Sequence, residues 1–145
     1  MAAVGAVVAL GLLGVLGPTT RTVASSAGSM RVEVAYAAVT RAGLATPWAV
    51  EVQRPGGFDG PIRIATTGTY FDGFDFNELY PEPVEMTSKG ELVVFEFAPP
   101  EGVLFRVRLD ARATPAWTLW RSAVTTVSVP GLPEARVSYR TIFLP

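Results

Sequence analysis

The 145-residue chain contains no cysteine and no histidine, and its formal net charge is −1. Without cysteine there is no disulfide framework, and without histidine the commonest general base and transition-metal ligand is missing. The balanced charge is not typical of a nucleic-acid-binding protein, so no nucleic-acid partner is predicted. Hydrophobic residues make up 49 % of the chain and charged residues 17 %, and much of this difference comes from the N-terminal segment.

Residues 1–20 contain no charged side chain, and Ala2 to Gly17 is a continuous apolar run. At about 1.5 Å per residue, twenty helical residues span roughly 30 Å, the thickness of the hydrocarbon core of a bilayer. The glycines of this run are ordinary in a membrane helix, and Pro18 ends the helix. The pattern predicts a single transmembrane helix that places residues 2–17 in the membrane.

A cleaved signal peptide is the alternative interpretation of the same segment. The small residues Ser25 and Ala27 would allow cleavage before Gly28. No Lys or Arg precedes the apolar run, so the positive-inside rule gives no orientation. Under either interpretation the rest of the chain is predicted to be extracytoplasmic, and a retained helix places the protein in the cytoplasmic membrane.

After the apolar run the hydrophobic pattern changes twice. Residues 21–29 are mostly small and lack a hydrophobic period, which predicts a linker. From Met30 onward the apolar residues alternate with polar ones, as in half-buried strands. Residues 30–145 are therefore predicted to form one β domain. Its expected strands lie near 30–36, 48–53, 61–64, 74–80, 93–97, 103–110, 119–129 and 135–143.

Short strands separated by Gly and Pro turns over about 115 residues are typical of a sandwich or barrel. The predicted fold is an all-β, immunoglobulin-like β-sandwich of about seven to nine strands, preceded by one transmembrane helix. The strands near 93–97 and 103–110 are joined by the turn sequence from Pro99 to Gly102 and are predicted to form a hairpin.

The stretch from Tyr70 to Tyr80 is the first candidate for partner contact, through Tyr70, Phe71, Asp72 and Phe74. Aromatic rings exposed together on a loop are typical of a binding surface, whereas alternate rings in a β-rich segment also fill a core. The neighbouring carboxylates Asp75 and Glu78 favour a second hypothesis, that the loop binds Ca²⁺ or an envelope glycan. The spacing matches no known calcium loop, so no metal site is assigned.

Trp117 and Trp120 are the second candidate for partner contact. Two indoles close to Arg121 suit the interface of a bilayer, where the ring is dry and the N–H is wet. Packing in the core at the start of a strand is the alternative explanation for both residues.

The sequence offers no convincing catalytic residue, metal ligand or cofactor motif. Glu82 and Glu85 form an acid pair, but nothing around them indicates a cleft. The serines, such as Ser128, lack both a nucleophile motif and a histidine partner. We therefore predict a protein that is not an enzyme, and a small-molecule ligand is not favoured.

The stretch from Tyr70 to Phe74 (YFDGF), followed by Tyr80 to Pro83 (YPEP), resembles a block found in uncharacterised small bacterial single-pass membrane proteins. The resemblance implies an N-terminal membrane helix followed by an extracytoplasmic β domain, and it implies no activity or site residue. The leading hypothesis is a membrane-anchored accessory module that binds an integral membrane protein or another envelope component.

Overall fold

The computed structural model describes residues 17–115 and 118–145 and forms ten strands and one short helix within them. These elements are β1 (Thr19–Ala27), β2 (Met30–Arg41), β3 (Trp48–Gln53), β4 (Ile62–Thr67), α2 (Gly68–Phe71), β5 (Phe74–Tyr80), β6 (Glu85–Lys89), β7 (Leu92–Phe97), β8 (Leu104–Ala113), β9 (Trp120–Ser128) and β10 (Ala135–Leu144). The predicted all-β fold is confirmed.

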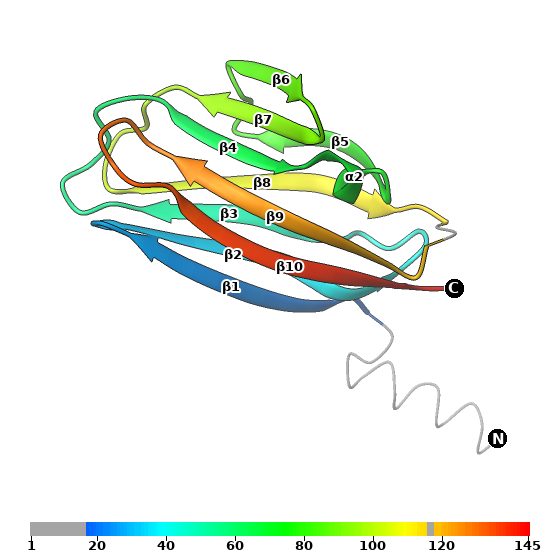
Figure 1. Ribbon diagram of the computed structural model, residues 1–145. Helices are drawn as coiled ribbons and strands as arrows, with labels where there is room; N and C mark the ends of the chain where they lie inside the picture. Colours follow the sequence, from blue (N-terminus) through cyan, green and yellow to red (C-terminus); the bar gives the residue numbers. More distant parts are fainter. Residues whose placement is uncertain (1–16, 116–117) are drawn as a thin grey trace.

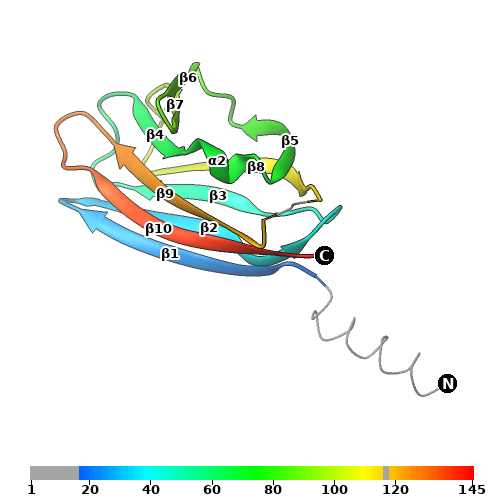
Figure 2. The same cartoon turned by 45° about the vertical axis from the view of Figure 1, so that its right-hand side comes forward.

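The strands are arranged as a sandwich of two layers (Figure 1). One layer contains β5, β8, β3 and β2 in that order, with β1 on β2, and the other contains β10, β9, β4, β7 and β6. The layers are joined where the C-terminal part of β2 pairs in parallel with the end of β10. In both views β1 lies beside β10 on this joined side (Figure 2). On the opposite side, the sheet order ends at β5 and β6.

The period-two pattern of the sequence builds the core between the layers. Buried and exposed residues alternate strictly along β8 and β10, because successive side chains of a strand point to opposite faces. Trp48 on β3 donates a hydrogen bond from Nε1 to the hydroxyl of Tyr139 on β10, at 2.8 Å. The rings of Phe97 and Phe105 meet across the same core with centroids 5.0 Å apart. Side chains from both layers therefore fill one continuous core.

The predicted linker at residues 21–29 is wrong, because most of it belongs to β1. This strand pairs with β2 from Thr19 to Ala27, and the two-residue turn Gly28–Ser29 connects them. Gly28 has a φ of 58°, which a glycine adopts easily at the first position of a tight hairpin turn. Backbone pairing, with only Val23 and Ala27 packed against the core, explains why no hydrophobic period marks this strand.

The predicted hairpin between residues 93–97 and 103–110 is also wrong. Both segments are strands, but β7 pairs with β4 and β6, whereas β8 pairs with β3 and β5. The turn sequence between them carries the chain from one layer to the other instead of reversing it within a sheet. Val103 precedes β8 and is exposed, although the pattern places it in the core.

Most of the predicted transmembrane segment lies in residues 1–16, outside the described residues. Of its last four residues, Thr19 and Thr20 belong to β1. None of the described residues forms a helix of the length and hydrophobicity that a membrane crossing needs.

Two buried tyrosines link the stability of the sandwich to alkaline pH. Burial raises the pKa of Tyr139 to about 12 from an ordinary value of 10.0, despite the lowering effect of its hydrogen bonds with Thr125 and Trp48. Burial also raises the pKa of Tyr70, against the lowering effect of its hydrogen bond with Thr141. The unfolded chain therefore loses these protons at lower pH than the folded chain does, and ionisation above pH 10 favours unfolding.

We expect stability to be unaffected by these groups below pH 10 and to fall as pH rises towards 12, by about 1.4 kcal/mol per pH unit for each tyrosine. Urea unfolding at several pH values between 10 and 12 measures how steeply the free energy of unfolding falls with pH. Tyr139→Phe removes one of the two groups and should lower the slope by about half. An equal slope in the variant would contradict the assignment to Tyr139.

Candidate interaction surface

The structure places three of the predicted contact residues in the core. Tyr70 is 0 % exposed, and Phe71 and Phe74 are buried beside it. The Tyr70 ring packs 5.2 Å from that of Phe74 and 5.4 Å from that of Tyr139, and its hydroxyl lies 2.8 Å from the Thr141 hydroxyl. The prediction that these three side chains contact a partner is wrong, because α2 turns Tyr70 and Phe71 into the space between the layers and Phe74 faces the same space from the first position of β5.

The remaining predicted contact residues have different positions. Asp72 is exposed directly after α2, and Trp120 is 51 % exposed at the start of β9. Trp117 lies outside the described residues. Contact of Asp72, Trp117 and Trp120 with a partner stays a prediction.

The acidic part of the same stretch does not gather into a metal site. Asp75 lies opposite Arg112 on the neighbouring strand, and Glu78 lies opposite Asp110 after a β-bulge. Among the described residues, no three His, Cys, Asp or Glu side chains are close enough to share a metal ion. Because the rings of Tyr70, Phe71 and Phe74 are buried as well, the acidic aromatic loop gains no support as a calcium or glycan site.

Another group of apolar side chains is exposed on the side of the sandwich where the sheet order ends at β5 and β6. Phe76, Tyr80, Val84 and Met86 are from 42 % to 65 % exposed, and we call them the open-edge surface. Phe76 and Tyr80 lie on β5, Met86 lies on β6, and Val84 lies on the connection between these strands. Single exposed apolar residues are normal, but four within eleven residues of sequence at one side of a fold are typical of an interaction surface.

The geometry of the edge strands explains why these residues are exposed. Phe76 pairs with the buried Ala111, and Met86 pairs with the buried Phe95, so both side chains point to the inner faces of their sheets. The Phe71 ring contacts both margins, with its centroid 6.2 Å from that of Phe76 and 6.2 Å from that of Phe95, the register partner of Met86. At Phe76 and Met86 the open-edge surface is therefore the uncovered margin of the core, whereas Tyr80 extends it onto the outer face of β5, where it pairs with the exposed Arg108.

The two edge strands differ in how easily another strand could pair with them. The β-bulge between Phe76 and Glu78 interrupts β5, while each strand carries two charged residues, Asp75 and Glu78 on β5 and Glu85 and Lys89 on β6. In contrast, β6 is paired without interruption along Glu85–Lys89, and within the described chain its one partner strand is β7. Bulges and charges protect edge strands from further pairing. The outer edge of β6 is the less protected of the two.

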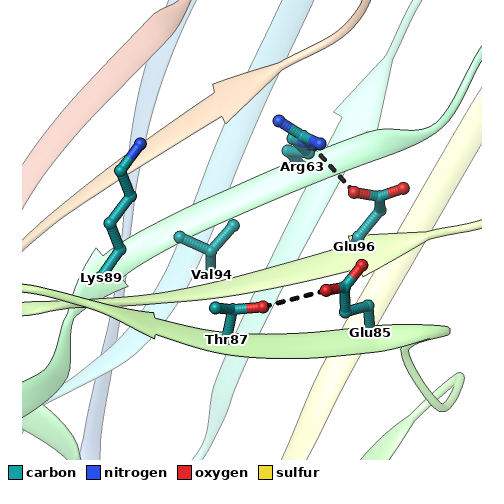
Figure 3. A pocket seen from close by; sticks show the side chains of 6 residues that line it. All are labelled: Arg63, Glu85, Thr87, Lys89, Val94 and Glu96. Carbon is teal, nitrogen blue, oxygen red and sulfur yellow. Dashed lines mark hydrogen bonds and ion pairs between the residues drawn. The ribbon is translucent and has the colours of Figure 1, made fainter.

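The outer face of β6 borders a shallow hollow (Figure 3). Arg63 and Glu96 form an ion pair across it, with Nε and Oε2 3.0 Å apart, and Thr87 donates a hydrogen bond to Glu85 at 3.3 Å. Lys89 lines its other end. The hollow is open and its charges are of both signs, so it offers polar contacts to a molecule lying along β6 rather than an enclosed binding site.

The sequence interpretation missed Val84 and Met86. The surrounding sequence, VEMTSK, alternates only weakly, and both faces of β6 are exposed along its whole length. A hydrophobic residue that faces inward at the end of a sheet has the same sequence signal as one in the middle of it. Only the order of the strands distinguishes the two.

The chain matches no known protein-family model, and no curated protein matches it. Among solved structures, it is similar to a non-cellulosomal cohesin from the hyperthermophilic archaeon Archaeoglobus fulgidus, with 14 % identity, a TM-score of 0.44, and coverage of 88 % of this chain and 92 % of that one. It is also similar to ACE19, the collagen-binding subdomain of the Enterococcus faecalis surface protein ACE, with 11 % identity, a TM-score of 0.39, and coverage of 76 % and 96 %. Similarity at this level does not indicate a function.

Proposed function

We propose that the protein is a non-enzymatic, membrane-anchored interaction module whose extracytoplasmic sandwich binds a membrane-protein or envelope partner through the open-edge surface. The observation that carries the proposal is the uncovered margin of the core between β5 and β6, where Phe76 and Met86 face inward and yet stay exposed. The proposal includes a single N-terminal membrane helix, location at the cytoplasmic membrane, and an immunoglobulin-like variant of the sandwich.

The fold favours retention of the N-terminal segment over cleavage before Gly28. Such cleavage would remove the whole of β1, which pairs with β2 along its entire length. It would also uncover the core where Val23 and Ala27 pack against it. A retained β1 keeps the apolar run of residues 2–17 covalently attached to the sandwich, and this anchor raises the effective concentration of the sandwich at the membrane.

The partner that best fits the open-edge surface is a protein segment in extended conformation. The outer edge of β6 presents backbone N–H and C=O groups that an added strand can pair with. Every second side chain of the added strand would be apolar. These side chains would cover Met86 on β6 and contact Phe76 on β5, on the other layer of the sandwich. Its other side chains would lie beside Glu85 and Lys89 on the outer face, where charge can select the partner.

Site-specific photo-cross-linking in bacterial membranes tests the proposal. The full chain carries a photoreactive residue either at Met86 or at Val103, which is also exposed but lies just before β8. We expect a discrete cross-linked protein from position 86 that is absent from position 103 and is lost when Phe76→Asp is added. Cross-links that are the same at both positions, or that persist with Phe76→Asp, would argue against the open-edge surface.

A further inference from the structure

A second exposed apolar group lies away from the open-edge surface, at the end of the sandwich where β1 begins. It contains Leu119, Trp120, Ile142 and Leu144, which are from 39 % to 61 % exposed, and we call it the terminal patch. The backbone of these residues is held by the sheet, because Trp120 pairs with Ile142 and the Phe143 N–H donates to the Leu119 carbonyl at 2.8 Å. Phe143 itself points into the core. The patch thus lies where the start of β9 meets the end of β10.

The terminal patch lies close to the point where the apolar N-terminal run joins the sandwich. Thr19, the first residue of β1, pairs with Val39, which pairs with Ile142, which pairs with Trp120. Neighbouring strands are about 4.8 Å apart, so these three steps span at most about 15 Å. A bilayer that held residues 2–17 would therefore be within reach of the patch.

Basic side chains accompany the patch. The Arg140 guanidinium lies over the Trp120 ring, 5.8 Å from its centroid, and Arg41 is the register partner of Leu144. Arginine beside exposed aromatic and aliphatic groups suits the headgroup region, where the guanidinium reaches phosphate and the apolar groups leave water. The acidic residues Asp72 and Glu91 also lie at this end, on the side of α2 and the β6–β7 turn. The charged side chains paired with the patch residues are therefore basic.

We infer that the terminal patch contacts the lipid headgroup region of the membrane and so holds the sandwich at a fixed orientation above it. This inference rests on the anchoring in the proposed function, but it concerns a different surface from the one that binds the partner. Contact through β9 and β10 at one end would leave β6 accessible along its outer edge. The membrane contact would therefore orient the open-edge surface for a partner in the same membrane.

The absence of cysteine permits a direct test with single labels on the full chain. Ile142→Cys and Val103→Cys are a matched pair, since the native residues are 41 % and 47 % exposed. Each variant carries an environment-sensitive fluorophore and is reconstituted in vesicles of phosphatidylcholine and phosphatidylglycerol. We expect the label at position 142 to emit at shorter wavelength, to be quenched several-fold less by aqueous iodide than the label at 103, and to be quenched by nitroxide lipids.

Three other outcomes would overturn the inference in distinguishable ways. Equal iodide quenching of the two labels, in a chain that floats with the vesicles, would leave the anchor intact and remove the membrane contact. If the label at position 142 is protected from iodide but is not quenched by nitroxide lipids, another protein or a second copy of the chain covers the patch. A chain that does not float with the vesicles would remove both the contact and the anchor.

Discussion

Replacing Tyr70 with alanine is expected to lower the free energy of unfolding by about 3–5 kcal/mol, the usual cost of deleting a fully buried aromatic side chain. The Tyr70 ring packs against Phe74 and Tyr139 and is completely buried. Its removal leaves a cavity between the layers and takes away the hydrogen-bond partner of Thr141. Urea unfolding of the full chain in detergent, followed by tryptophan fluorescence, measures the change.

Tyr70→Phe is the matched control, because it keeps the ring and removes only the hydroxyl. Thr141 still donates its hydroxyl to the Ala37 carbonyl at 2.6 Å, so no buried donor is orphaned. The expected cost is about 0.5–1.5 kcal/mol, the net value of one ordinary hydrogen bond. Near-normal stability of Tyr70→Ala, combined with loss of partner binding, would instead restore Tyr70 as a contact residue.

The parts of the fold that the sequence predicts well are the strands with one face on the core and one in water. In β8, the buried Phe105, Val107 and Leu109 alternate with exposed Arg106 and Arg108, and the pattern identifies both the strand and its inner face. The same holds for β10, and the predicted bounds of β5 agree with the structure. Alternation is informative wherever burial differs between the two faces.

The strands that the sequence does not predict lack this difference. The half-buried positions of β1 are Val23, Ser25 and Ala27, which are small or polar, and every residue of β6 is exposed, so neither strand shows a clear hydrophobic period. Their positions follow from backbone pairing with β2 and β7. The same limit applies to the false hairpin, because alternation in β7 and β8 does not show which strand pairs with which.

Three of the side chains predicted to contact a partner are buried, and the exposed apolar side chains of this region lie farther along the chain. Rings at Tyr70, Phe71 and Phe74 give the same sequence signal whether they fill a core or cover a surface. In the structure α2 turns Tyr70 and Phe71 into the core, and Phe74 faces it from the first position of β5. Farther along the chain, Phe76 faces inward and is exposed because β5 ends the sheet order. The position of a strand at an edge is a property of the topology, and no local pattern encodes it.

Met86→Lys is expected to weaken binding of the partner by about 30-fold or more, which corresponds to the 2 kcal/mol typical of a central interface residue. Met86 faces inward from β6 and is 60 % exposed, so an added strand would bury it against the margin of the core. A lysine there would have to lose its hydration or exclude the partner. The effect on folding should stay within about 0.5 kcal/mol, because the native side chain is largely in water.

Val103→Lys is the control for this substitution, since Val103 is exposed to a similar extent and is remote in sequence from both edge strands. Affinity for the protein cross-linked at position 86, measured on the full chain in membranes, should fall for Met86→Lys and remain unchanged for Val103→Lys. An equal fall in both variants would indicate a general effect of charge on the sandwich. Unchanged affinity in both would place the partner on another surface, because an apolar strand-addition interface does not accommodate an unpaired ammonium group at its centre.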